Sequence, residues 1–165
     1  MEITFQGKPM TLCGRPLQAG DPLPDFTLTD GALQPMKPGD LCVPCVLLAV
    51  PSLDTGVCDQ EVRRFNQAAA GFDKAAVYAV SLDLPFAQTR WCGGAGVDRV
   101  QALSDYKDHS FGKATGTRVE QLGLLTRAVF VIDGGRKVAY AQYVPEITDH
   151  PDYDACLASL RSVIR

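Results

Sequence analysis

Six cysteines give this 165-residue chain its clearest capacity for chemistry, and Cys58 has the most informative surroundings. A thiolate is a strong nucleophile, whereas a neutral thiol is a weak one. Cys58 follows a short loop, residues 51–57, and falls in the first turn of a predicted helix. Free backbone N–H groups and the positive end of the helix dipole favour thiolate over thiol there. The sequence therefore predicts a reactive nucleophile at Cys58.

Charged residues close to Cys58 in the sequence act in opposite directions on its ionisation. Acidic neighbours oppose formation of a thiolate, and basic neighbours favour it. The acidic ones are Asp54, Asp59 and Glu61, and the basic ones are Arg63 and Arg64. Because the two sets offset each other, a reactive thiolate would need a further cation.

The elements that would position Cys58 are a strand, a helix and a second strand. Residues 45–50 are a continuous apolar run that ends at Pro51, a pattern typical of a strand buried on both faces. Apolar residues then recur at helical spacing up to Gly71, and residues 75–82 indicate another buried strand. This order predicts a right-handed crossover between two parallel strands.

Further elements are predicted on both sides of this unit. Residues 1–14 are expected to form an N-terminal β-hairpin, because extended segments flank a glycine-containing turn. A short strand is expected near Phe26. Pro85 at a first helical position predicts a helix that carries Cys92 near its end and stops at the glycines of residues 93–96.

The C-terminal part should supply an antiparallel strand pair and a last helix. Residues 126–132 and 138–144 are strand-like runs around a turn at residues 133–136, and a helical pattern follows Pro151. The expected fold class is α/β: a thioredoxin-like mixed sheet flanked by helices, with an N-terminal β-hairpin, in a single domain over residues 1–165. This element order alone also admits other α/β folds.

Composition and charge exclude several classes of partner. The formal net charge is −3 and no run of Lys or Arg stands out, so no nucleic acid partner is expected. No apolar stretch approaches the roughly 20 residues of a spanning helix, so no membrane partner is expected. The first residues lack the basic and apolar regions of a secretory signal, which predicts a cytoplasmic location. In that setting, six cysteines favour redox or metal chemistry over a static disulfide framework.

Pro51, Thr55 and Cys58 match the peroxiredoxin pattern Pro-x-x-x-Thr-x-x-Cys. Beyond this motif, the chain resembles the thiol peroxidase (Tpx) branch of the peroxiredoxins, in its atypical two-cysteine form. The resemblance covers nearly the whole chain, and the stretches that carry it are residues 51–58, 63–66, 83–88, 127–133, 146–148 and 151–153.

This resemblance implies a thiol-specific peroxidase that reduces hydrogen peroxide and organic hydroperoxides. Cys58 would be the peroxidatic cysteine and become a sulfenic acid. Thr55 would hydrogen-bond the peroxide, and Pro51 would shield the pocket. Arg127 would be the missing cation and would stabilise charge as the O–O bond breaks. Cys92 would then resolve the sulfenic acid into a Cys58–Cys92 intramolecular disulfide.

The same resemblance implies the partners and a conformational change. Thioredoxin would be the reductant, no cofactor or metal would be required, and alkyl or lipid hydroperoxides would be preferred substrates. The protein would be a homodimer with an interface near the active site. Disulfide formation requires Cα atoms within about 7 Å, so two cysteines on separate helices imply local unwinding. The glycines near Cys92 make that region easy to loosen.

Cys42 and Cys45 form a C-x-x-C motif that leads directly into the predicted strand over residues 45–50. A redox motif of the thioredoxin type opens a helix instead, so structural thiols are favoured here, while an accessory disulfide or metal site stays open. A four-cysteine zinc site is not expected because the sequence has no second C-x-x-C. Cys13 and Cys156 are expected to be core or surface thiols.

Two alternative functions stay open at this point. A redox-sensing or protein-binding module could use the Cys58–Cys92 switch to signal, and it would be distinguished by slow, single oxidation without turnover. A disulfide reductase of the thioredoxin type could use Cys42 and Cys45. A Cys-His catalytic pair is not favoured, because the chain has only two histidines and both lie in polar, loop-like segments.

Overall fold

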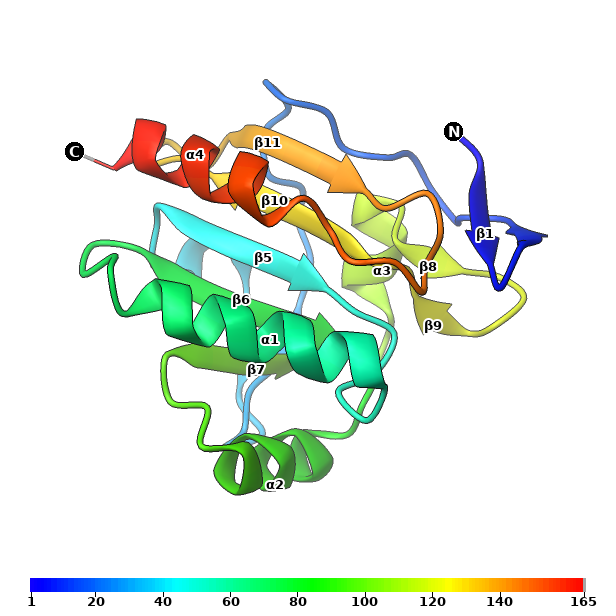
Figure 1. Ribbon diagram of the computed structural model, residues 1–165, viewed down its shortest axis with the longest axis horizontal. Coiled ribbons are helices and arrows are strands. Elements are labelled where there is room, and N and C mark those ends of the chain that lie inside the picture. Colours follow the sequence, from blue (N-terminus) through cyan, green and yellow to red (C-terminus); the bar gives the residue numbers. More distant parts are fainter. Residues whose placement is uncertain (165) are drawn as a thin grey trace.

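A seven-stranded mixed sheet forms the centre of the computed structural model, which describes residues 1–164 (Figure 1). Its strand order is β11-β10-β5-β6-β7-β3-β4. In chain order these strands are β3 (Leu28–Thr29), β4 (Pro35–Met36), β5 (Cys45–Ala49), β6 (Ala76–Ser81), β7 (Val100–Ser104), β10 (Ala128–Ile132) and β11 (Val138–Tyr143). The helices are η1 (Pro38–Asp40, a 3-10 turn), α1 (Gly56–Ala69), α2 (Pro85–Ala95), α3 (Ser110–Thr115) and α4 (Tyr153–Val163). Two separate antiparallel pairs are β1 (Ile3–Phe5) with β2 (Lys8–Met10), and β8 (Arg118–Val119) with β9 (Leu124–Leu125).

The strand, helix and strand predicted around Cys58 are β5, α1 and β6. β5 and β6 are parallel, as are β6 and β7, and β10 pairs antiparallel with β5 on its other side. Every residue of β5 and β10 is buried, which explains their continuous apolar sequences. The α/β class, the mixed sheet flanked by helices and the N-terminal hairpin are confirmed.

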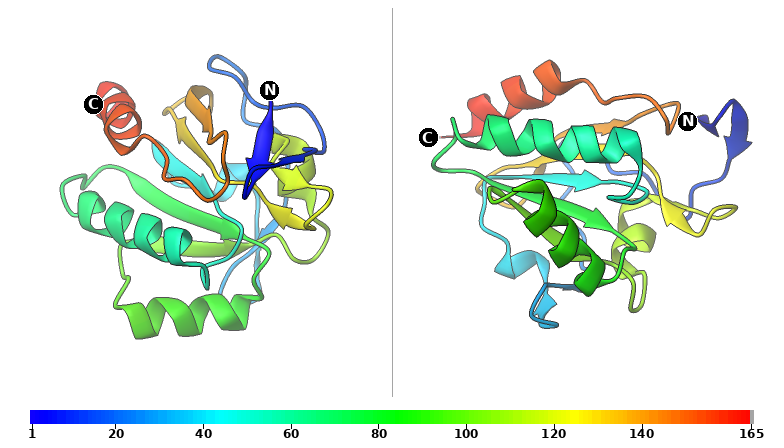
Figure 2. Two further views of the ribbon diagram at one scale, coloured as in Figure 1. Left: turned by 45° about the vertical axis from the view of Figure 1, so that its right-hand side comes forward. Right: turned by 60° about the horizontal axis from the view of Figure 1, so that its bottom comes forward.

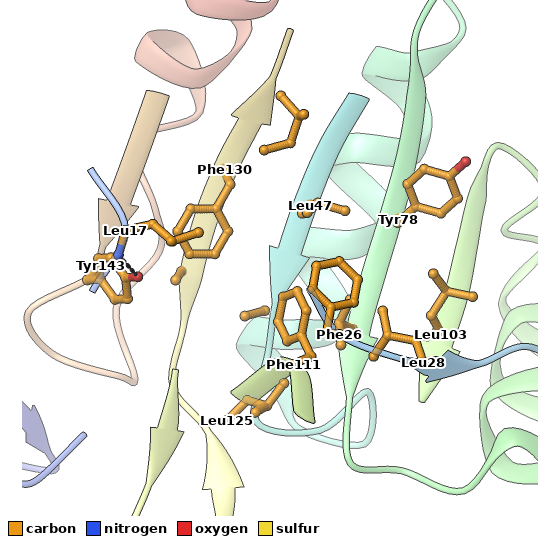
Figure 3. Close-up of a cluster of buried hydrophobic side chains, with 14 of the residues drawn as sticks. Leu17, Phe26, Leu28, Leu47, Tyr78, Leu103, Phe111, Leu125, Phe130 and Tyr143 are labelled. Atoms are coloured by element: carbon orange, nitrogen blue, oxygen red, sulfur yellow. Dashed lines mark hydrogen bonds between the residues drawn. The ribbon is translucent and has the colours of Figure 1, made fainter. Parts of the chain in front are cut away.

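Alternate residues of β5 enter two hydrophobic clusters, one on each face of the sheet. Val46 and Leu48 belong to the cluster under α1 and α4, which lie over the same face in both views of Figure 2. Leu47 belongs to the opposite cluster, drawn in Figure 3. There the rings of Phe26 and Phe111 meet edge to face, with centroids 5.1 Å apart. The central strands are therefore fixed from both sides.

The N-terminal hairpin is joined to the segment that follows β11. β1 and β2 turn at Gln6 and Gly7, whose φ angles of 51° and 79° suit a tight hairpin turn. The Gly7 N–H donates to the Glu146 carboxylate at 2.8 Å, and the Thr148 N–H donates to the same carboxylate at 2.9 Å. Bonds from Thr148 and Gly7 lower the pKa of Glu146 to about 2, so this anchor is ionised at neutral pH.

The helix prediction over the Cys92 region needs one correction. α2 continues through Gly93 and Gly94 and ends at Ala95, where Gly96 caps it with a left-handed φ of 67°. Two of the glycines are therefore helical, because only the residue after the last turn has to adopt a positive φ. The strand β7 and the short helix α3 were not predicted, since their sequences mix polar and apolar residues. Within residues 1–164, no helix is long and apolar enough to cross a membrane.

Candidate active site

Cys58 lies in the first turn of α1 and is fully buried, with 0% of its surface exposed. Thr55 is the N-cap of the helix and has an extended backbone conformation. Its hydroxyl donates to the Ser52 carbonyl at 3.0 Å, and its own carbonyl accepts the first helical bond from Asp59 at 2.9 Å. The loop before the helix is thus held in place, and Cys58 stands where backbone N–H groups and the helix dipole favour a negative charge.

The Arg127 side chain reaches Cys58 from the strand β10 side of the sheet. It is 2% exposed, although an arginine next to a strand is more often an edge or surface residue. Its Nη2 donates to Cys58 Sγ at 3.2 Å, its Nη1 to Glu61 Oε2 at 2.6 Å, and its Nε to the Ile147 carbonyl at 2.8 Å. Burial alone would lower the pKa of Arg127, but Glu61 and Cys58 raise it overall. All three guanidinium nitrogens therefore have a partner and their directions are fixed.

Glu61 is a member of the site that the sequence reasoning treated only as an adverse charge. It is 0% exposed and lies one helical turn after Cys58, on the same face of α1. One carboxylate oxygen accepts from Arg127, and the other, Oε1, has no hydrogen-bond partner among the described residues. Burial raises the pKa of Glu61, and the Arg127 charge offsets only part of this rise. Its position three residues after Cys58 indicates that the two side chains share a face of the helix. The sequence did not indicate that Glu61 orients a buried arginine.

A cavity of about 300 Å³ lies over this buried cluster. It is bounded by the start of α1, the N-terminal hairpin and the segment after β11. Its lining residues are Phe5, Gln6, Pro51, Thr55, Gly56, Val57, Arg127, Ile147 and Thr148. The structure therefore brings Pro51, Thr55 and Arg127 to one pocket. The sequence around the hairpin did not indicate that it lines this pocket, because its position depends on contacts between the two ends of the chain.

The loop that carries Pro51 and Thr55 is tied to the end of β6 by Asp83. The Asp83 carboxylate accepts from the Ser52 hydroxyl at 2.7 Å, the Leu53 N–H at 2.8 Å and the Ser81 hydroxyl at 2.8 Å. One acidic side chain thus satisfies three donors around the turn. This network fixes the pocket wall without contacting the Cys58 sulfur.

The structure does not bring Cys92 into the pocket. Cys92 is half-buried on α2, burial raises the pKa of its thiol, and it lines a different cavity of about 300 Å³ beside β7. α1 and α2 contact each other through Arg63, whose Nη1 donates to the Ala95 carbonyl at 3.2 Å. The Arg63 guanidinium also lies over the Trp91 ring, 5.7 Å from its centroid. Cys58 and Cys92 are both free thiols on separate helices.

The other four cysteines are free thiols in different surroundings. Cys45 and Cys156 are 0% exposed, and burial raises the pKa of each to about 12. Cys42 is exposed, and Cys13 is half-exposed with its Sγ 3.7 Å from Glu120 Oε1. Within residues 1–164, no group of three or more His, Cys, Asp and Glu side chains is arranged to hold a metal ion.

Comparisons with known proteins point in one direction. The chain matches the Redoxin family model over residues 18–157. It is 47% identical over 162 residues to a thiol peroxidase of Clostridium acetobutylicum, covering 98% of this chain and 99% of that protein. It is 46% identical over 165 residues to a thiol peroxidase of Bacillus subtilis, covering 99% of each chain. The solved structure of a peroxiredoxin-like protein from Aquifex aeolicus superposes with a TM-score of 0.91 at 38% identity, over 99% of this chain and 97% of that one.

Proposed function

This chain belongs to the Redoxin family and is an oxidoreductase of the peroxidase class, and on that premise we propose that Cys58 is the residue that attacks the hydroperoxide. In this step the Cys58 thiolate bonds to one peroxide oxygen, the O–O bond breaks, and the other oxygen leaves as alcohol or water after taking up a proton. Cys58 becomes a sulfenic acid. The observation that carries the proposal is the 3.2 Å contact between Arg127 Nη2 and Cys58 Sγ beneath the pocket.

Arg127, Thr55 and Pro51 have distinct parts in the proposed step. The Arg127 donor is already oriented, so it can stabilise negative charge on the leaving oxygen without reorganising. Thr55 lines the pocket at the N-cap of α1, where its hydroxyl and the first helical N–H groups offer hydrogen bonds to a peroxide. Pro51 lines the same pocket, is buried, and excludes water from one side of Cys58.

The pocket lining supports organic hydroperoxides as substrates. Phe5, Val57 and Ile147 contribute apolar surface close to Arg127. An alkyl group would gain free energy by covering that surface, whereas hydrogen peroxide would not. We therefore include alkyl and lipid hydroperoxides in the proposed substrate class, together with hydrogen peroxide.

Cys92 is the proposed resolving residue. Its thiol attacks the Cys58 sulfenic acid, the S–S bond forms, and the sulfenic oxygen leaves as water. Because both residues lie on ordered helices, the turns around them must unwind first, and Gly93 and Gly94 in the last turns of α2 lower the cost of unwinding. Thioredoxin would reduce the disulfide, so no prosthetic group is required. Indistinguishable amide exchange of α2 in the reduced and oxidised protein would contradict this step.

The test is a single-turnover experiment with one equivalent of cumene hydroperoxide. Trp91 lies beside Cys92 in sequence and packs near α1, so its fluorescence should change quickly on oxidation, and peptide mapping should find a Cys58–Cys92 disulfide. Cys58→Ser should abolish peroxide consumption. Cys92→Ser should permit one oxidation but block cycling with thioredoxin. Full turnover by Cys58→Ser, or a disulfide that excludes Cys58, would overturn the proposal.

Two exposed apolar side chains support a homodimer with its interface near the active site. Leu84 is 52% exposed and Phe86 is 69% exposed, and both follow Asp83, which holds the active-site loop. Burying such a pair against a second copy would remove apolar surface from water. Sedimentation velocity should therefore show a dimer that Phe86→Asp converts to a monomer, whereas a monomer in the unaltered protein would refute this part.

A further inference from the structure

The C-x-x-C pair, Cys42 and Cys45, lies at the opposite end of the sheet from Cys58. Cys45 is the first residue of β5, and the loop to Cys58 leaves from the last residue, Ala49. A strand rises about 3.3 Å per residue, so β5 alone separates the two regions by about 13 Å. The pair is therefore not part of the pocket described above.

The two thiols of this pair differ in access to solvent. Cys42 is exposed and lies outside any helix or strand, whereas Cys45 is fully buried in the sheet. The Cys42 N–H donates to the Tyr78 hydroxyl at 2.9 Å, and Arg136 Nη2 donates to the Leu41 carbonyl at 3.1 Å. These two bonds hold the backbone before the strand. Between the cysteines, the Pro44 carbonyl accepts from the Ala76 N–H of β6 at 3.3 Å, so the segment is tied to the sheet next to Cys45.

The two sulfurs are also electrostatic neighbours. Burial raises the pKa of Cys45 to about 12, the Arg136 guanidinium acts against this rise, and a charge on Cys42 adds to it. Burial also raises the pKa of the Tyr78 hydroxyl to about 12, and charges on Cys42 and Cys45 add to that rise. Cys42 and Cys45 are three residues apart and share Tyr78 as a neighbour. A disulfide between them requires their Cα atoms to lie within about 7 Å.

Cys42 opens into a cleft of about 450 Å³ between the starts of β6 and β7. Val77, Tyr78 and Val100 give the cleft a buried apolar floor. Asp98 and Arg99 line it as well and are exposed, so one charge of each sign borders the cleft. A small molecule with both an amine and a carboxylate would find complementary charges beside the exposed thiol.

We propose that Cys42 and Cys45 form a second thiol-disulfide site, which exchanges with low-molecular-weight disulfides of the amino-acid or small-peptide type bound in this cleft. First, the Cys42 thiolate attacks one sulfur of the small disulfide, forming a mixed disulfide and releasing one small thiol. Then the Cys45 thiolate attacks the Cys42 sulfur, closing the Cys42–Cys45 bond and releasing the second small thiol. The protein loses two electrons and two protons, and the small disulfide gains them.

The order of these steps follows from access and from the surroundings of Cys45. A disulfide in solution reaches only Cys42, because Cys45 is 0% exposed. The second step requires the Cys45 thiolate, which is scarce because burial raises the pKa of this thiol to about 12. The mixed disulfide on Cys42 should therefore accumulate before the intramolecular bond closes.

The experiment follows this sequence in the full-length Cys58→Ser protein, in which the peroxide reaction cannot supply the oxidant. Reduced protein is mixed with glutathione disulfide, quenched with acid, denatured and labelled with N-ethylmaleimide. Cleavage before aspartate then releases residues 40–53, which contain Cys42 and Cys45 and no other cysteine. The fragment should first carry glutathione and one label, and later carry neither. Cys45→Ser should stop at the mixed disulfide, and Cys42→Ser should leave Cys45 fully labelled.

Cys13, which is half-exposed and far from the pair in sequence, serves as the internal control for non-selective reaction. Retention of both labels on residues 40–53, or modification of Cys13 as fast as Cys42, would overturn the proposal. So would a mixed disulfide that never closes in a protein with Cys45 present.

The role of the cleft is tested separately with Arg99→Ala. An exposed ion pair contributes about 0.2–1 kcal/mol, so the variant should react about 1.4- to 5-fold more slowly with glutathione disulfide. Its rate with uncharged hydroxyethyl disulfide should not change. Arg90→Ala, at an exposed position on α2, is the matched control. Equal effects on both disulfides would overturn recognition by Arg99.

Discussion

Arg127→Lys is the substitution that tests the buried guanidinium most directly, because it keeps the positive charge and removes the fork of donors. Arg127 uses three nitrogens for three partners in different directions: Cys58, Glu61 and the Ile147 carbonyl. A lysine ammonium is a single point of charge and does not reproduce this planar geometry. We expect it to pair with the Glu61 carboxylate, so that Cys58 loses its donor.

The magnitude follows from the bonds that are lost. Removing one preoriented donor from developing charge lowers a rate about 10²–10³-fold, equivalent to about 2.7–4 kcal/mol. The second-order rate constant for peroxide with Cys58 should fall by this factor. The unpaired Ile147 carbonyl should cost about 1–3 kcal/mol of unfolding free energy. For a chain of this size, each kcal/mol lowers Tm by about 2–4 °C.

The assay measures both quantities on the same preparation. Stopped-flow Trp91 fluorescence gives the rate with cumene hydroperoxide, and circular dichroism gives Tm. Arg15→Lys is the matched control, because Arg15 is an exposed arginine that pairs at the surface with Asp21. An unchanged rate in a folded Arg127→Lys protein would refute the role of the fork. A rate that falls only in proportion to the folded fraction would show that Arg127 acts on stability alone.

Three further outcomes follow from the same contacts. Burial raises the pKa of Glu61 above its ordinary 4.5 despite Arg127, so the unfolded chain releases this proton first. The contribution of Glu61 to the free energy of unfolding is therefore complete below pH 4.5 and is lost as pH rises through the raised pKa. Glu61→Gln should flatten this fall, measured as urea midpoints across the pH range. An unaltered curve would contradict the raised pKa of Glu61. Glu146→Ala removes the hairpin anchor, so the Gly7 amide should exchange at least about tenfold faster in hydrogen-exchange mass spectrometry, and unchanged protection would refute the anchor. Phe5→Ala should slow cumene hydroperoxide about tenfold, as expected for about 1.4 kcal/mol of lost apolar contact, and leave hydrogen peroxide unaffected; equal slowing of both would exclude Phe5 from substrate recognition.

Local patterns were sufficient to predict the elements around Cys58. The apolar run of β5 ends at Pro51, the helical spacing ends at Gly71, and the next apolar run is β6, so each boundary has a residue that explains it. β7 was missed because Gln101 and Ser104 break its apolar pattern, although Ser104 is itself buried. The end of α2 was placed too early because glycine lowers helix propensity by only about 1 kcal/mol, which tertiary packing overcomes.

The pocket could be predicted only in part. Thr55 and Cys58 are neighbours in sequence, and helix geometry places them together. Phe5 lies more than a hundred residues from Arg127 and Ile147 in the chain, so no local pattern encodes their meeting in one pocket. The family resemblance identified Arg127 as a site residue. It did not indicate that three hydrogen bonds, to three different partners, hold its side chain in place.

The proposed active site combines side chains from positions as distant as Phe5 and Ile147, and this has a consequence for synthesis of the protein. At about 5–20 residues per second, the roughly 90 residues after Cys58 that end at Ile147 take about 4–18 s to add. During that interval Cys58 has neither its guanidinium nor the Ile147 carbonyl that orients it, and β5 lacks its neighbour β10. A growing chain therefore contains the Cys58 thiol before it has the residues that would make the thiol reactive. Peroxidase activity should begin only when almost the whole chain has left the ribosome, and a product truncated before Ile147 should contain Cys58 but remain inactive.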